Sequence, residues 1–111
     1  MKPNFEVYFF ETSRGTCPVK EFILSQEEST VLKITKTIEY LEKGGPFLRP
    51  PHAKKILHNL YELRVQGKEV IRIFYSKIAG EYYLLHAFKK KARKTPRKEI
   101  ETALDRLNEL T

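Results

Sequence analysis

The residues of this sequence that are best suited to do chemistry are cations, and many of them lie close together. Residues 86–98 (HAFKKKARKTPRK) contain no acidic residue. The basic residues of this segment are Lys89, Lys90, Lys91, Arg93, Lys94, Arg97 and Lys98. A run of like charges can be a solvated surface, but seven charges in 13 residues are typical of a segment that contacts a polyanion. We therefore expect this basic run to bind phosphate groups.

A second set of polar residues precedes the basic run and has the spacing of a strand face. Residues 56–65, 70–76 and 81–88 are strand-like, and alternate side chains of a strand point to opposite faces of the sheet. We expect Glu62, Arg72 and His86 to form one cross-strand row, with Arg64 diagonally beside it. One interpretation is a Glu62–Arg72 ion pair on a solvated face, which would contribute at most about 1 kcal/mol. The other is a cationic platform that grips a phosphate, for which arginine is better suited than lysine.

The other face of these three strands is predicted to be the core. Its members are Tyr61, Leu63, Val65, Ile71, Ile73, Tyr75, Tyr83, Leu85 and Ala87. Burying all of them together requires hairpin loops with odd residue counts, because a slip of one residue turns every side chain of a strand over. Gln66–Lys68 and Lys77–Glu81 satisfy this requirement, and both contain a glycine.

Other kinds of site are weakly supported. His52 and His58 have no neighbouring carboxylate in the sequence that would complete a metal site, and no metal or cofactor is expected. Cys17 is the one cysteine, so it cannot form an intramolecular disulfide or a cysteine zinc site. Gly44-Gly45 is not followed by the Lys-Ser/Thr pair of a nucleotide-binding loop.

These residues are positioned by a short series of predicted elements. Residues 5–10 (FEVYFF) form a strand, and Pro18 begins a helix that ends near Leu24. Ser25 and Glu28 have capping-box spacing, and the helix that follows ends at Gly44-Gly45. The proline-rich segment 46–55 is expected to be a basic loop, and Thr95 to cap a last helix.

The predicted order of elements is β-α-α-β-β-β-α. It defines a single α+β domain over residues 1–111, in which a mostly antiparallel sheet carries an N-terminal helical hairpin on one face.

Charge along the chain supports a polyanion partner. The net charge is +7, but residues 1–48 sum to −1, residues 49–98 to +11 and residues 99–111 to −3. Such a local excess suits nucleic acid, and it also suits an acidic protein. No apolar run approaches the roughly 20 residues of a membrane span, so we expect no membrane partner. The lone cysteine favours the reducing cytoplasm.

Several blocks of the sequence together resemble a known family. YELRV, RIFYS, YYLLHAFKKKARKTP and EIETALDR are similar to the RelE/ParE superfamily of toxins from bacterial toxin–antitoxin systems, most closely to its HigB-like, phage-derived branch. The resemblance covers residues 5 to 108. It implies a small α+β fold and an endoribonuclease that cleaves mRNA on the ribosome without a metal. It also implies a tightly bound antitoxin, which we expect to be a helix-turn-helix protein that links the toxin to operator DNA.

The resemblance also implies roles for individual residues. Arg72 would stabilise transition-state charge, with Lys90 or Lys89 beside it, Arg64 would position the RNA backbone, and His86 would transfer a proton. The remaining predicted RNA contacts are Lys91, Arg93, Lys94, Lys54 and Lys55. Some relatives use a tyrosine or histidine near the C-terminus as acid or base, but TALDRLNELT contains neither, so the general acid stays unassigned.

Two alternatives remain open at this stage. Members of the ParE type poison DNA gyrase rather than cut RNA, so the cations could serve only to recognise a protein. The chain could also be an inactive nucleic-acid-binding member that retains antitoxin and operator binding.

Overall fold

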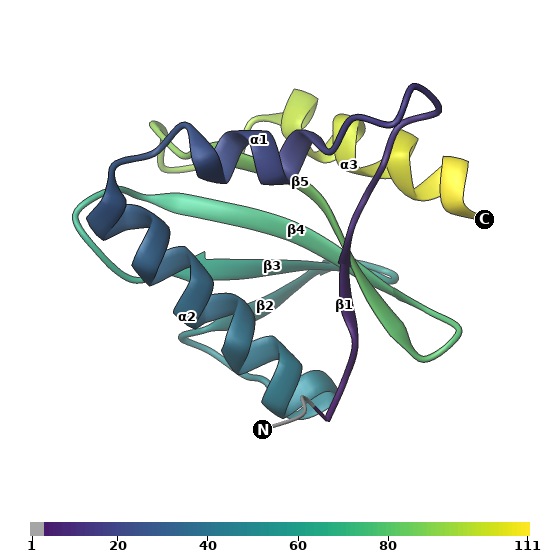
Figure 1. The fold of residues 1–111 in the computed structure, drawn as a ribbon, viewed down its shortest axis with the longest axis horizontal. Helices are drawn as coiled ribbons and strands as arrows, with labels where there is room; N and C mark the ends of the chain where they lie inside the picture. The colour runs from purple at the N-terminus through teal and green to yellow at the C-terminus, as the bar shows by residue number, and fades with distance from the viewer. Residues whose placement is uncertain (1–3) are drawn as a thin grey trace.

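A computed structural model describes residues 4–111, in which helices pack on both faces of a five-stranded sheet (Figure 1). The elements in chain order are β1 (Val7–Phe9), α1 (Pro18–Leu24), α2 (Glu28–Gly44), a 3₁₀ turn η1 (Gly45–Phe47), β2 (Ala53–Leu57), β3 (Leu60–Val65), β4 (Ile71–Ile78), β5 (Glu81–Lys89) and α3 (Arg97–Leu110). The predicted α+β class and mostly antiparallel sheet are confirmed.

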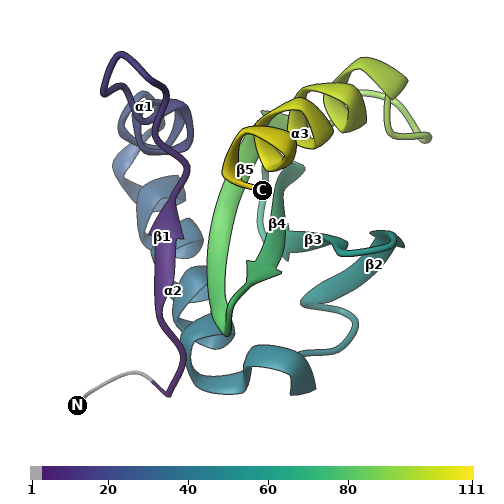
Figure 2. The ribbon, with the colours of Figure 1, turned by 90° about the vertical axis from the view of Figure 1, so that its right-hand side faces the viewer.

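The sheet has the order β1-β5-β4-β3-β2. Strands β2 to β5 form an antiparallel meander, whereas β1 runs parallel to β5 at the edge, with Val7 opposite Tyr82. Figure 2 shows β1 next to β5 and β2 at the far side of the sheet. The chain therefore closes its sheet by bringing its first strand against its last.

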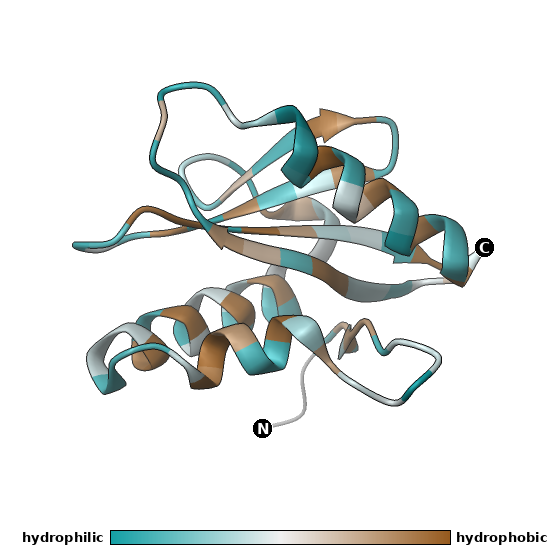
Figure 3. Ribbon diagram, turned by 90° about the horizontal axis from the view of Figure 1, so that it is seen from above, coloured by the Kyte–Doolittle hydropathy of each residue, from teal (hydrophilic) through white to brown (hydrophobic). Residues whose placement is uncertain are grey.

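Two apolar layers hold the helices on the sheet. The larger lies between the sheet and the helical pair α1–α2, and it contains Val19, Ile34, Leu41, Leu63 and Ile73. The smaller lies under α3 and contains Phe10, Leu60, Phe74, Leu85, Phe88 and Ala103. Figure 3 shows the sheet between the helical pair on one side and the C-terminal helix on the other. The face predicted to be solvated is thus partly covered by α3.

Strand β5 contains a bulge that changes the predicted core. Phe74 lies opposite His86 but Tyr75 lies opposite Leu84, so Leu85 is an extra residue in the ladder. A bulge lets two successive side chains lie on the same side of a strand. As a result Tyr82 and Leu84 join Ala87 in the α1–α2 core. The prediction that Tyr83 and Leu85 belong to that core is wrong, because both pack against the α3 side.

The hairpin loops also differ from the prediction. Five residues, 66–70, join β3 to β4, while only Ala79 and Gly80, both with positive φ, join β4 to β5. Arg72 consequently lies opposite Arg64, and the predicted row of Glu62, Arg72 and His86 does not form. The strand face of these residues is nevertheless correct, because the β3–β4 register differs from the predicted one by an even number of residues.

Three local predictions fail at element ends. The Ser25 hydroxyl donates to the Phe22 carbonyl and closes α1, so it does not cap α2. Helix α3 begins at Arg97 with Pro96 as its N-cap and no side-chain cap, so Thr95 does not cap it. The basic loop predicted through residue 55 is shorter, because β2 begins at Ala53, and the predicted strand 56–65 is broken at Asn59, which has a φ of 53°.

Candidate functional site

A buried carboxylate lies between two arginines on the α3 side of the sheet. The Glu62 side chain is only 2% exposed. Its Oε2 accepts a hydrogen bond from Arg64 Nε at 3.2 Å, and its Oε1 lies 3.6 Å from Arg72 Nε. A carboxylate this deeply buried requires charged partners, and both arginines supply one. The ion pair weighed from the sequence therefore exists, but it is buried rather than solvated.

The two arginines face each other directly across β3 and β4. Arg64 and Arg72 are a register pair, and their side chains are 30% and 16% exposed. Burial lowers the pKa of Arg72 below its ordinary value, Glu62 opposes this shift and Arg64 adds to it. Two like charges at this spacing repel each other, and one carboxylate neutralises only one of them. The pair therefore keeps a net positive charge that an incoming anion would neutralise.

The arginines line an open hollow of about 290 Å³ at this end of the sheet. Its other walls come from Pro51 and from the β3–β4 loop, including Gln66 and Glu69. Within residues 4–111, Arg72 uses Nη1 to donate to the Ile71 carbonyl at 3.1 Å, but its buried Nε has no hydrogen-bond partner. A guanidinium has five N–H donors, so Arg72 retains donors for a ligand. This hollow, which we call the arginine hollow, has the charge and donors of a phosphate site.

The basic run begins at the rim of the arginine hollow. The Lys90 amide donates to the Val70 carbonyl at 2.7 Å, and Val70 lines the hollow. Lys89, at the end of β5, lies 3.9 Å from the rim residue Glu69. The exposed residues of the run that follow are Lys91, Arg93 and Lys94. The structure thus brings Arg64, Arg72 and the start of the run to the same end of the sheet.

The two lysines of β2 are placed on different faces. Lys54 lies opposite Glu62 and shares its face, whereas Lys55 lies opposite Tyr61 on the α1–α2 side. Both side chains are exposed. Lys54 is therefore a neighbour of the buried carboxylate, and Lys55 is separated from it by the sheet.

His86 is held by α3, a partner that the sequence reasoning missed. Its Nε2 lies 2.7 Å from Glu99 Oε1, and its Nδ1 lies 3.3 Å from Arg106 Nη1. Since the Arg106 guanidinium can only donate, Nδ1 accepts and Nε2 carries the proton that it donates to Glu99. The ring also stacks on Phe88, with centroids 5.5 Å apart. Both nitrogens of His86 are therefore engaged within the protein.

Arg106 anchors α3 to the sheet at the same place. It donates to the Leu85 carbonyl at 2.8 Å, and burial lowers the pKa of its guanidinium. Glu99, Ala103 and Arg106 follow one another at helical spacing on the face that packs on β5. That spacing is the signal in the sequence that could have predicted these contacts.

The described residues show neither a metal cluster nor a membrane helix. Among residues 4–111, no group of three or more His, Cys, Asp and Glu side chains could hold a metal ion. No helix in this part of the chain has the length and apolar character needed to cross a membrane.

The fold and the arginine hollow together define a small α+β protein with a cationic end. The family model described as Phage derived protein Gp49-like (DUF891) matches residues 21–108, so this chain belongs to the Gp49-like, phage-derived family. A search of curated proteins found no significant match. The phage-derived part of the predicted resemblance is thus confirmed, while its HigB-like branch stays a prediction.

Proposed function

We propose that this Gp49-like protein is the toxin of a toxin–antitoxin system and cleaves mRNA on the ribosome without a metal ion. The observation that carries the proposal is the pair of facing arginines, held by one buried carboxylate at an open hollow whose rim carries a basic run. Membership of the Gp49-like family is consistent with a toxin-like protein.

The proposed reaction is attack of a 2′-hydroxyl on the adjacent phosphate. It needs a proton acceptor, cations for the charge that builds up on the phosphate oxygens, and a proton donor for the leaving oxygen. Arg72 supplies the cation with unused donors, and Arg64 holds the backbone opposite it. Lys89 and Lys90 lie at the rim, where an ammonium can neutralise or protonate the leaving oxygen. His86 can transfer a proton only after it releases Glu99 or Arg106.

RNA binding is assigned to the exposed cations around the hollow. Lys54, Lys91, Arg93 and Lys94 are solvent-accessible and lie on the Glu62 face or in the run that leaves it. Each phosphate that they neutralise releases counterions, so affinity should fall steeply as salt rises. A flat salt dependence would contradict polyanion binding.

The test is induced expression with mapping of mRNA 5′ ends, run in parallel with a gyrase supercoiling assay. We expect new, codon-phased cuts that disappear in Arg72→Ala and persist in Arg14→Ala, which removes an exposed arginine from the loop before α1. Arg72→Lys should also be impaired, since lysine cannot reproduce the bidentate grip. Loss of supercoiling with intact transcripts would instead favour a ParE-like gyrase inhibitor.

The proposed antitoxin is tested separately. A short neighbouring reading frame that encodes a helix-turn-helix protein is expected, and its product should suppress the toxicity and copurify with this chain. Neutral growth on induction, together with retained binding to that partner and its operator, would favour an inactive member of the family.

A further inference from the structure

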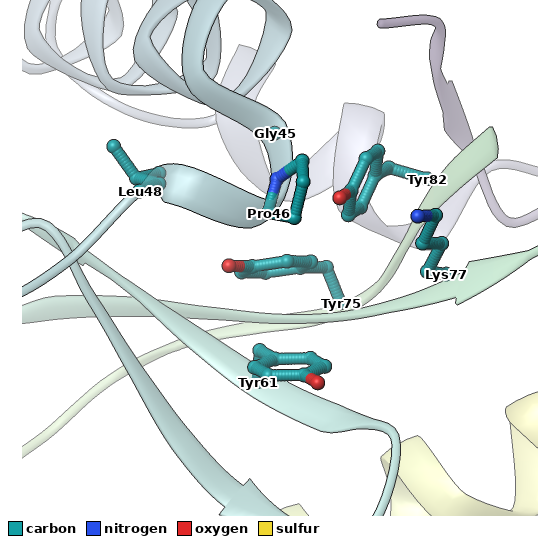
Figure 4. A pocket seen from close by; sticks show the side chains of 7 residues that line it. All are labelled: Gly45, Pro46, Leu48, Tyr61, Tyr75, Lys77 and Tyr82. Atoms are coloured by element: carbon teal, nitrogen blue, oxygen red, sulfur yellow. The ribbon is translucent and has the colours of Figure 1, made fainter. Parts of the chain in front are cut away.

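A second hollow lies on the opposite face of the sheet, between β3, β4, β5 and the turn after α2. It is lined by Tyr61, Tyr75, Tyr82 and Lys77 from the strands and is roofed by residues 45–48, and we call it the tyrosine pocket (Figure 4). Its volume is about 210 Å³. That volume is below the 300–1,000 Å³ of typical sites for drug-sized ligands, so it suits a single ring system.

The aromatic rings of the tyrosine pocket form a continuous wall. Tyr61 and Tyr75 are a cross-strand pair whose rings stack with centroids 5.4 Å apart, and Tyr82 meets Tyr75 edge to face at 5.8 Å. Figure 4 shows Pro46 on the side of the Tyr75 ring away from Tyr61, with Tyr82 and Lys77 beside it. The wall therefore offers flat apolar contact to a planar ligand.

The hydroxyl groups of this wall distinguish it from ordinary packing. Tyr75 and Tyr82 are each only 3% exposed, and buried tyrosine hydroxyls normally have a hydrogen-bond partner. Within residues 4–111 the hydroxyls of Tyr61, Tyr75 and Tyr82 form no hydrogen bond, and none of them is fully buried. Burial raises the pKa of Tyr75 well above its ordinary value, so its hydroxyl keeps its proton and can donate. The pocket thus presents free polar groups next to an apolar wall.

A cation stands at the rim of the pocket. Lys77 lies opposite Tyr82 in the ladder, and its Nζ is 6.0 Å from the centre of the Tyr82 ring. Lys77 is exposed and has no acidic partner in the described part of the chain. Its ammonium group is therefore available to an anion attached to a ring in the pocket.

We propose that the tyrosine pocket binds one nucleotide unit, with the base against the tyrosine rings and the phosphate on Lys77. Aromatic faces next to a cation are a common way to hold a base and its phosphate, and each stacked base contributes about 1–3 kcal/mol to such binding. The pocket opens on the α1–α2 side of the sheet, away from Arg64 and Arg72, so this site is separate from the proposed cleavage site. The nucleotide can be free or part of an RNA strand.

The test uses adenosine 5′-monophosphate as the probe, titrated into the full chain and followed by calorimetry and by backbone amide NMR shifts. We expect saturable binding with the largest shifts at Gly45, Lys77 and Tyr82. Adenosine and inorganic phosphate alone should each bind at least about tenfold more weakly, since each makes half of the contacts. Largest shifts at Arg64 and Arg72, equal binding of inorganic phosphate, or no binding at millimolar concentrations would each overturn the proposal.

Variants separate the two sites and the two sources of the nucleotide. Lys77→Gln and Tyr75→Phe should each weaken binding about five- to tenfold, and Lys36→Gln, on the exposed side of α2, should not. Arg72→Ala should leave this binding intact even if it abolishes cleavage, so failure of one proposal does not imply failure of the other. A triadenylate that binds more tightly than the mononucleotide, and that loses affinity in Lys77→Gln, would identify an RNA strand as the source. Tighter binding of the mononucleotide would identify the free nucleotide. Unchanged affinity in Lys77→Gln and Tyr75→Phe would overturn the site.

Discussion

Replacing Glu62 by glutamine should test the organisation of the arginine hollow. The substitution keeps the shape of the side chain and removes its charge, which leaves Arg64 and Arg72 facing each other without a counter-charge. The two Nε–Oε distances are 3.2 and 3.6 Å and the carboxylate is 2% exposed, so both interactions belong to a buried ion pair. Breaking a buried pair costs about 3–5 kcal/mol.

The expected cost for Glu62→Gln is somewhat lower. Both arginines retain some contact with water, and the glutamine oxygen can still accept the hydrogen bond from Arg64. We therefore expect a loss of about 2.5 kcal/mol in the free energy of unfolding, which for a chain of this length lowers Tm by about 10 °C. Thermal unfolding followed by circular dichroism measures this directly.

Added phosphate gives the same experiment a second readout. An anion that binds between the arginines replaces the missing carboxylate, so inorganic phosphate should raise the Tm of Glu62→Gln more than that of the wild type. The matched control is Glu69→Gln, which removes the same charge from the exposed rim of the hollow, where Glu69 lies 3.9 Å from Lys89. The reasoning is refuted if Glu62→Gln unfolds within about 1 °C of the wild type, or if Glu69→Gln costs as much.

Three further predictions concern other parts of the molecule. Gly45→Ala should lower the free energy of unfolding by about 3 kcal/mol in urea titrations, because the residue has a φ of 50° and a Cβ would lie 2.5 Å from an aromatic ring of the amino-terminal segment; Gly80→Ala, with nothing within 4 Å, should lose only about 1 kcal/mol. Burial, and then the neighbouring Glu39, raise the pKa of Glu42, so the folded state holds this proton more tightly and stability falls as pH rises through 4.5 and above. Glu42→Gln should therefore stabilise the protein by about 0.5 kcal/mol at pH 7, with no gain below about pH 4, and a gain that persists at low pH would contradict this cause. His86→Ala should cost about 2–3 kcal/mol of stability yet leave cleavage by the folded variant within about threefold of the wild type, because both ring nitrogens are engaged; a loss of more than about a hundredfold in cleavage would instead assign proton transfer to this residue.

The class of the fold could be predicted from the sequence because the signals were local. Pro18 at the start of α1, helical periodicity up to Gly44-Gly45 and three strand-like segments separated by glycines are each read within a few residues. The face that carries Glu62, Arg64, Arg72 and His86 followed from the period of two in a strand.

The details of the site depend on contacts between distant segments, and these the sequence did not reveal. The bulge at Leu85 follows from how β5 fits between β4 and β1, and nothing in the local residues marks it. Burial of Glu62 follows from the layers that pack around the α3 side of the sheet. Composition described Glu62 only as an acid among cations, whereas its position between Arg64 and Arg72 is what defines the hollow.

The pairing of β1 with β5 also determines when the protein can finish folding during synthesis. Val7 pairs with Tyr82, and α1 packs on β5 as well, so the first two elements have no sheet neighbour until almost the whole sequence has been translated. At about 5–20 residues per second, the amino-terminal quarter of the chain waits several seconds for its partner. Ribosomes that stall before codon 82 would therefore release fragments in which β1 has no strand to join, and such fragments should be substrates for proteases rather than active protein.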